Sequence, residues 1–102
     1  MKIIDFEKVE PQLSPHGIEL RKFPVNGKAV IVAKLKPGDK IDKHTAEGDA
    51  FFFILEGTGV FMYDENEITV GSETLIECPG TTERGWRNES DQVLRFLVIK
   101  DN

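Results

Sequence analysis

Few residues in this chain carry an imidazole or a thiol, the groups that most often bind transition metals or act as strong nucleophiles. It has two histidines, His16 and His44, and a single cysteine, Cys78. One cysteine excludes an intramolecular disulfide and a zinc site built from several thiolates. His44 could act as a general base or as a ligand donor, or it could only hydrogen-bond to a neighbour. His16 is interpreted as a turn residue, and Cys78 as a small buried hydrophobic side chain rather than a nucleophile.

Arg84, Trp86 and Asn88 stand at every second position along one segment. In a β-strand such residues share one face, so all three would point toward the protein interior together. A buried guanidinium is costly unless it is paired, either with a carboxylate of the chain or with a carboxylate or phosphate of a ligand. The alternative is that Arg84 lies at the rim, where water solvates it. The candidate partners within the chain are Glu47, Asp49 and Glu77.

Turn-forming residues punctuate the chain at short and fairly even intervals, with β-branched and aromatic residues between them. This pattern predicts an all-β domain, a sandwich or barrel of short strands. Asn26-Gly27 is a typical type I′ hairpin signal between the first two strands. The segment Phe6–Leu13 could hold one helical turn, which Pro11 would keep short. The expected strands are Ile18–Phe23, Ala29–Leu35, Ala50–Glu56, Gly59–Tyr63, Glu67–Val70, Thr74–Glu77, Gly85–Asn88 and Val93–Ile99.

Two of these strands carry apolar residues on both faces: Ala50–Leu55 throughout, and Val93–Ile99 nearly so. A strand of this kind in an antiparallel sheet needs cover on both sides. One face can line the interior, but the other would be an exposed apolar patch and an aggregation hazard if nothing covered it. We therefore expect a homodimer. The alternative is that the N-terminal segment of the same chain covers the patch.

Two stretches of the chain resemble the two conserved motifs of the cupin superfamily. In Gly38–Gly59 the family pattern is a glycine, a His-x-His pair, a glutamate and a closing glycine. In Gly71–Asn88 it is a glycine, a Pro-x-Gly turn, a histidine and an asparagine. The order and spacing of these stretches carry the resemblance, which covers nearly the whole chain. It implies a single cupin domain over residues 1–102, a double-stranded β-helix or jelly-roll barrel, with an N-terminal arm (1–17) before the barrel (18–102).

In the family, the His-x-His pair, the glutamate and the histidine of the second motif bind a metal ion. The resemblance places His44 at the first of these positions, Ala46 at the second, Ala50 at the glutamate and Arg84 at the last. A catalytic divalent site generally needs three protein ligands, and alanine and arginine supply none. No firmly bound metal cofactor is therefore expected, although a divalent ion held partly by His44 stays open. The residues that could complete such a site are Glu47, Asp49, Cys78 and His16.

Small residues at the vacated ligand positions would leave room for an organic molecule. Phe52 and Ile54 share the strand face of Ala50, so they would form an apolar wall. Trp86 could stack on a flat ligand or simply fill the core. We expect a pocket that binds a small organic molecule, anionic or aromatic. Its expected lining residues are His44, Ala46, Ala50, Phe52, Ile54, Arg84 and Trp86.

Three functions follow from these features, and the fold alone does not choose among them. We favour a small-molecule-binding protein that catalyses no reaction. The alternatives are a metal-dependent enzyme of dioxygenase or isomerase type with atypical ligands, and a structural or regulatory interaction module. The chain has 18 acidic and 13 basic residues, a net charge of −5, so neither nucleic acid nor an anionic membrane is an expected partner. Without the apolar stretch of a signal peptide at its N-terminus, a cytoplasmic location is expected.

Overall fold

The computed structural model describes residues 1–46 and 48–101, and its regular structure is almost entirely β-strand. Among these residues, no helix has the length and hydropathy needed to cross a membrane. One turn of 3-10 helix, η1 (Phe6–Lys8), lies within the segment where a helical turn is expected. The strands are β1 (Gln12–Leu13), β2 (Glu19–Val25), β3 (Lys28–Leu35), β4 (Lys40–His44), β5 (Ala50–Glu56), β6 (Gly59–Tyr63), β7 (Asn66–Val70), β8 (Leu75–Cys78), β9 (Arg84–Arg87) and β10 (Leu94–Asp101).

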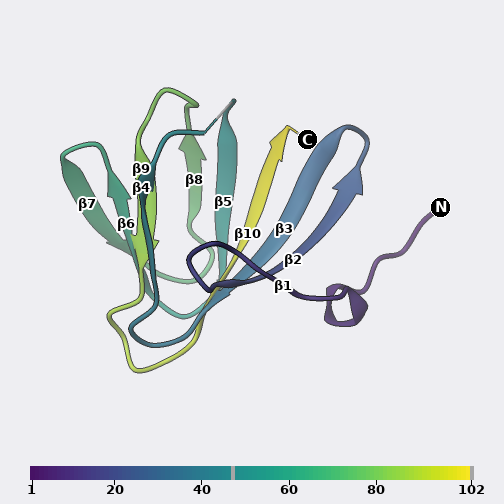
Figure 1. Ribbon diagram of the computed structural model, residues 1–102, viewed down its shortest axis with the longest axis horizontal. Coiled ribbons are helices and arrows are strands. Elements are labelled where there is room, and N and C mark those ends of the chain that lie inside the picture. The colour runs from purple at the N-terminus through teal and green to yellow at the C-terminus, as the bar shows by residue number, and fades with distance from the viewer. Residues whose placement is uncertain (47, 102) are drawn as a thin grey trace.

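The strands form two antiparallel sheets that face each other (Figure 1). The larger sheet has the strand order β1-β2-β3-β10-β5-β8, and the smaller has the order β4-β9-β6-β7. Side chains of both sheets fill the space between them, with Ile54, Trp86 and Phe96 among those that are almost fully buried. This is the all-β architecture that the spacing of the turns predicts.

All eight predicted strands are present: Ala50–Glu56 and Gly59–Tyr63 have the predicted bounds, and the ends of the others differ by at most two residues. The turn between β2 and β3 has positive φ angles at both Asn26 (47°) and Gly27 (78°), as a type I′ hairpin requires. The sequence pattern misses β1 and β4. In β4, Ile41 is the only apolar residue, and charged or polar residues surround it. Because the alternation of apolar residues is the main signal for a strand, an edge strand of this composition gives none.

The two faces of β5 differ in burial, as the alternation of its residues predicts. Ala50, Phe52 and Ile54 are buried between the sheets, whereas Phe51 and Leu55 are each 40% exposed on the outer face. Leu75 of the neighbouring β8 is 63% exposed. The chain therefore leaves an apolar patch on the outer side of its larger sheet.

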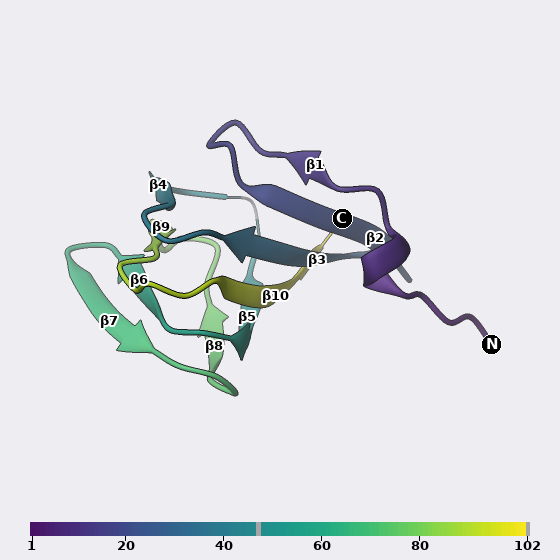
Figure 2. The same ribbon diagram turned by 90° about the horizontal axis from the view of Figure 1, so that it is seen from below.

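The N-terminal arm lies elsewhere on the molecule. Arg21 of β2 donates hydrogen bonds from Nη1 to the backbone oxygens of Phe6 and Glu7, at 3.0 and 2.9 Å. Figure 2 shows η1 and the N-terminus on the β2 side of the larger sheet, away from β5 and β8. The alternative in which this segment covers the patch on β5 is therefore wrong.

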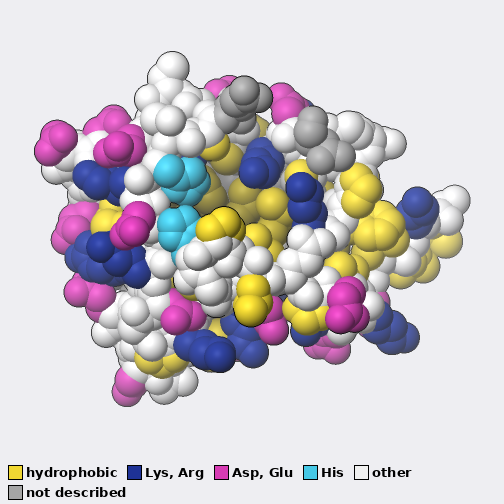
Figure 3. Space-filling model, viewed as in Figure 1, with side chains coloured by type: hydrophobic (Ala, Val, Ile, Leu, Met, Phe, Trp, Pro, Cys, Tyr) yellow, Lys and Arg dark blue, Asp and Glu magenta, His cyan; other side chains and the backbone are white. Residues whose placement is uncertain are grey.

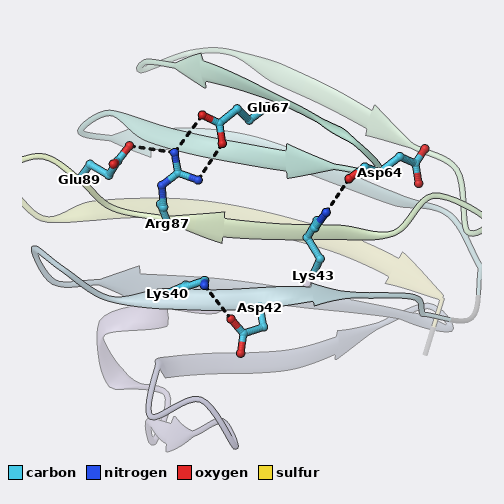
Figure 4. A network of polar contacts seen from close by, with 7 residues as sticks. All are labelled: Lys40, Asp42, Lys43, Asp64, Glu67, Arg87 and Glu89. Carbon is cyan, nitrogen blue, oxygen red and sulfur yellow. Dashed lines mark hydrogen bonds and ion pairs between the residues drawn. The ribbon is translucent and has the colours of Figure 1, made fainter.

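The outer face of the smaller sheet is held by ion pairs (Figure 4). Arg87 of β9 donates two hydrogen bonds to the carboxylate of Glu67 on β7, at 2.8 and 3.0 Å, and lies 3.0 Å from a carboxylate oxygen of Glu89. The hydrogen bonds from Arg87 hold the pKa of Glu67 below its usual value. This network gives the smaller sheet a polar outer surface, unlike that of β5.

Asn88, directly after β9, ties together loops at the end of the barrel opposite to His44. It is 1% exposed, and its Nδ2 donates to the backbone oxygens of Leu35 (3.0 Å) and Gln92 (2.8 Å). Its Oδ1 accepts hydrogen bonds from the backbone N–H and the hydroxyl of Ser90, at 3.0 and 2.7 Å. Both donors and both acceptor sites of this buried amide are therefore used.

We expect Asn88→Ala to lower the free energy of unfolding by about 3–5 kcal/mol, because several buried groups lose their partners at once. Chemical denaturation followed by circular dichroism measures this loss. Ser90→Ala is the control, because it removes the hydroxyl alone and should cost about 1 kcal/mol. A loss below 1 kcal/mol for Asn88→Ala would show that the loops do not depend on this side chain.

Candidate ligand-binding site

A cavity of about 130 Å³ lies between the two sheets at one end of the barrel. Figure 3 shows the corresponding hollow, with hydrophobic side chains in its floor and the two histidines at its rim. Ile54, which is expected in the lining, is instead fully buried in the core and does not reach the cavity. The other six residues expected there do line it: His44, Ala46, Ala50, Phe52, Arg84 and Trp86.

His44 reaches the rim because β4 pairs with β9, where it lies opposite Arg84. Gly85 lets the two strands approach, since a Cβ atom at this position would lie 2.5 Å from the backbone oxygen of Ile41. The His44 side chain is exposed, and its Nδ1 is 3.0 Å from the backbone oxygen of Asp42. One ring nitrogen is thus engaged locally and the other is available to a ligand or to water.

His16 lies beside His44, with ring centroids 6.2 Å apart and the rings tilted by 32°. Its sequence position between two turn residues explains its place in the loop before β2, as predicted. The position of His16 beside His44 at the rim depends on how this loop packs against β4. The residues around His16 do not reveal that packing.

Lys100 is a further lining residue, which the apolar pattern of the sequence does not predict. It lies opposite Ala50 in the pairing of β10 with β5, so both side chains point into the barrel. The predicted strand stops at Ile99, whereas β10 continues to Asp101. The position was recoverable from alternation, because Phe96, Val98 and Lys100 share one strand face.

Arg84 is buried, with 4% of its surface exposed, so the alternative in which it is solvated at the rim is wrong. Its Nη1 donates to the backbone oxygens of Thr82 at 3.1 Å and of Pro79 and Gly80 at 3.4 Å. Two of these bonds are long and therefore weak.

No carboxylate within residues 1–46 and 48–101 forms an ion pair with Arg84. Of the three partners that the sequence suggests, Asp49 accepts a hydrogen bond from the backbone N–H of Gly80 at 2.9 Å, and Glu77 is exposed. Glu47 lies outside the described residues. In the part of the chain that the structure describes, the guanidinium is thus a buried cation that only carbonyl dipoles compensate.

Trp86 occupies the centre of an aromatic cluster that forms the wall and floor of the cavity. Its ring stacks on Phe96, with centroids 4.5 Å apart and an interplanar angle of 22°, and meets Phe52 edge-on at 5.6 Å. The residue is 2% exposed, and its Nε1–H has no hydrogen-bond partner among the described residues. Trp86 therefore both fills the core and lines the cavity, which are the two alternatives that the sequence leaves open.

Two loops, one after Ala46 and one before Arg84 of the cavity lining, touch each other through their backbones. A Cβ atom at Gly80 would lie 2.7 Å from the backbone oxygen of Gly48, so only glycine fits there without displacement. The hydrogen bond from the N–H of Gly80 to Asp49 joins the same two loops. The contact fixes the segment whose carbonyls surround Arg84.

The side chains at the four positions of the metal ligands in cupins do not fit a tightly held divalent ion. His44 supplies one imidazole, Ala46 and Ala50 supply methyl groups, and Arg84 supplies a cation. Cys78 is no substitute, because it lines a separate groove between β7 and β8 and burial raises the pKa of its thiol. Across residues 1–46 and 48–101, no three His, Cys, Asp or Glu side chains are grouped so that they could bind a metal.

Comparison with known proteins gives a family match and a partial match to a characterised enzyme. A family model described as a cupin domain matches residues 31–100. A 5-nitrosalicylic acid 1,2-dioxygenase from a Bradyrhizobium species is 27% identical over 67 residues, which are 66% of this chain and 32% of that enzyme. The match thus spans about a third of the length of that relative.

Solved structures with the same fold cover nearly the entire chain. A predicted oxalate decarboxylase from Thermotoga maritima has a TM-score of 0.89 and 18% identity over 98% of each chain. A polyketide cyclase from Streptomyces resistomycificus has a TM-score of 0.88 and 20% identity, over 99% of this chain and 79% of the cyclase. At these identities the likeness establishes the jelly-roll barrel and nothing about activity.

Proposed function

The chain belongs to the family of cupin domains, and from this premise we propose that its barrel cavity binds a small aromatic carboxylic acid without a resident metal ion. The observation that carries this proposal is the buried guanidinium of Arg84. A cation in an apolar interior is costly when no anion accompanies it. The carboxylate of a ligand can supply the missing charge and accept two parallel hydrogen bonds from the guanidinium.

The charges around the cavity favour an anion. Arg84 and Lys100 approach it from opposite sheets, and His44 stands at its rim. None of the described lining residues is acidic, although the whole chain has a net charge of −5. A concentration of positive charge in a hollow with apolar walls attracts small anions to that point of an otherwise acidic protein.

The size and walls of the cavity favour a single aromatic ring. An apolar cavity of about 150 Å³ is known to accommodate benzene, and this cavity of about 130 Å³ is open at the rim. Phe52, Trp86 and Phe96 offer ring faces and edges that can pack on a flat ligand. The relative from Bradyrhizobium is named for a nitrosalicylic acid, itself a small aromatic carboxylic acid, which agrees with this ligand class.

We propose binding rather than metal-dependent catalysis, even though the dioxygenase and the polyketide cyclase named above are enzymes. The reason is the donor set: a divalent centre would need ligands that Ala46 and Ala50 cannot provide. A non-catalytic binding protein needs only a shaped cavity and a charge to match its ligand.

Benzoate is the first compound to test, and benzamide is its neutral control of nearly the same shape. At a benzoate concentration a hundred times its Kd, the free energy of unfolding should rise by about 2.7 kcal/mol. Benzamide should bind at least about ten times more weakly, because it cannot pair with the guanidinium. The measurements are thermal shift and isothermal titration calorimetry. Equal binding of both compounds, or no stabilisation by any small aromatic acid, would refute the proposal.

The uncovered patch on the larger sheet predicts that two copies of the chain associate. Phe51 and Leu55 are exposed there beside Leu75, and patches of this kind generally mark an interaction surface. Light scattering after size exclusion should give the mass of a dimer, and Leu75→Lys should give a monomer. Leu13→Lys is the matched control, because Leu13 is 77% exposed but lies on β1, at the opposite edge of the larger sheet from β8. A monomer at every concentration would contradict the prediction.

A further inference from the structure

Lys100 is a second cation at the cavity, and the positions beside it offer no acceptor. It lies near the end of β10, on the strand face that also carries Phe96 and Val98. Directly opposite it on the two adjacent strands are Ala29 and Ala50, whose methyl groups accept no hydrogen bond. The Lys100 side chain is half-buried and lines the cavity. Its ammonium group thus finds no partner among the side chains that flank it in the sheet.

Two acids share a second cavity, of about 290 Å³, with Lys100, but both have other partners. Asp101 forms an ion pair with Lys28, and Asp49 accepts a hydrogen bond from a backbone N–H group of the loop before β9. Among the residues that the structure describes, no carboxylate oxygen lies within 4.0 Å of the Lys100 ammonium group. Lys100 is therefore a cation of the cavity lining to which this part of the chain supplies no anion.

The pairing of the strands arranges the inward-facing side chains of the barrel in layers. Arg84 lies opposite His44 of the rim, and Lys100 lies opposite the first residue of β5. Figure 1 shows the end of β10 and the beginnings of β5 and β9 at the same end of the barrel. Trp86 and Phe52 come two residues further along β9 and β5, so they belong to the next layer inward. The cavity thus has its two cations at the open end and aromatic rings beneath them.

We infer that the ligand is a dianion whose second acid group binds Lys100, and that both acid groups are on the same side of one aromatic ring. This inference rests on the proposed function, because it concerns the same cavity. Arg84 is on the smaller sheet and Lys100 on the larger, and packed sheets are about 10 Å apart. A carboxylate that accepts two parallel hydrogen bonds from Arg84 engages both its oxygens on that wall. The opposite wall therefore calls for a second acid group, while the ring fills the apolar space below.

The three benzenedicarboxylates test this geometry, because they have the same atoms and, when fully ionised, the same charge. In phthalate and isophthalate both acid groups can face the mouth while the ring points inward. In terephthalate they are at opposite ends of the ring, so one of them would have to enter the apolar floor. Phthalate or isophthalate should bind about ten times more tightly than benzoate, and terephthalate should not. Calorimetric titration at one ionic strength measures the four affinities with equal screening of charge.

Lys100→Met tests whether this side chain is the contact that favours the second acid group. The quantity to compare is the affinity of the preferred isomer divided by that of benzoate, which should fall from about ten to about one. Lys34→Met is the matched control, because Lys34 is also half-buried on the larger sheet but lines a cavity on its outer face, beside the N-terminal arm. It should leave the ratio near ten. Lys100→Gln is a second variant with the same expected loss, should methionine disturb the fold.

The outcomes distinguish this inference from the proposed function. If benzoate binds but no dicarboxylate binds more tightly, the inference is overturned and the proposed function stands. Equal gains for all three isomers would indicate a general attraction for double charge and would overturn it as well. So would an equal loss for benzoate and the preferred isomer in Lys100→Met, because one carboxylate would then be shared by both cations. If neither benzoate nor any dicarboxylate binds, both fail together.

Discussion

Arg84→Met should abolish the binding of benzoate and at the same time stabilise the ligand-free protein. Methionine matches the length of the arginine stem and fills irregular apolar space, but it brings no charge. Affinity should fall about 100-fold or more, because a buried charge-assisted pair with the carboxylate is lost. The free energy of unfolding should rise by about 1 kcal/mol, because the protein no longer buries a cation that has no carboxylate partner among the described residues. Calorimetric titration and chemical denaturation measure the two effects.

The opposite signs of these effects separate a ligand-binding role from a structural one. If Arg84 served mainly to tie down the loop through Thr82, its replacement would destabilise the protein. Arg87→Met is the matched control, since it removes a cation from the outer face of the same strand. It should leave benzoate binding within about two-fold and should not raise stability. Weaker binding caused equally by both substitutions would point to long-range charge instead of direct contact.

Restoring the donors of the cupin motif should turn the cavity into a metal site. The combined substitutions Ala46→His, Ala50→Glu and Arg84→His add three donors to His44, and all four positions line one cavity. Four such ligands around one point suit Zn²⁺, and a Kd of micromolar or tighter corresponds to about −8 kcal/mol or more. Elemental analysis of the purified variant should find stoichiometric metal, and Zn²⁺ should raise its melting temperature.

The same variant with His44→Ala is the control, because it removes one donor while keeping the other three. It should bind Zn²⁺ at least about ten times more weakly. Were the variant with all four donors to bind no metal, the side chains at these positions would not converge as the cavity lining implies. The unsubstituted protein, which has one imidazole among the four positions, gives the reference level of Zn²⁺ binding.

Much of the barrel could be predicted because its strands obey simple alternation. In β5 the buried and exposed residues follow the predicted order, with Phe52 inside and Phe51 outside. In β9 the same rule places Arg84 and Trp86 in the interior. The failures are at the edges: β4 lacks an apolar face, and the last inward residue of β10, Lys100, stands beyond the apolar run that marks the strand.

The polar environment of the site could not be predicted, because it depends on contacts between distant segments. Sequence identifies Arg84 as a cation that needs a partner, but it does not reveal that carbonyls of the preceding loop, between β8 and β9, accept hydrogen bonds from it. The sequence likewise does not reveal that the N–H of Trp86 has no partner among the described residues, because this depends on how the ring packs. What a residue leaves unsatisfied is decided only when the whole chain has folded around it.

The backbone contact between Gly48 and Gly80 has a consequence for the thermodynamics of binding. A mouth whose loops already rest on each other has little conformational entropy left to lose when a molecule enters. A ligand of a dozen atoms makes few contacts and could not offset the ordering of two mobile loops. The contact between Gly48 and Gly80 thus keeps the entropic cost of ordering low enough for so small a molecule to bind. Binding should then be driven mainly by enthalpy.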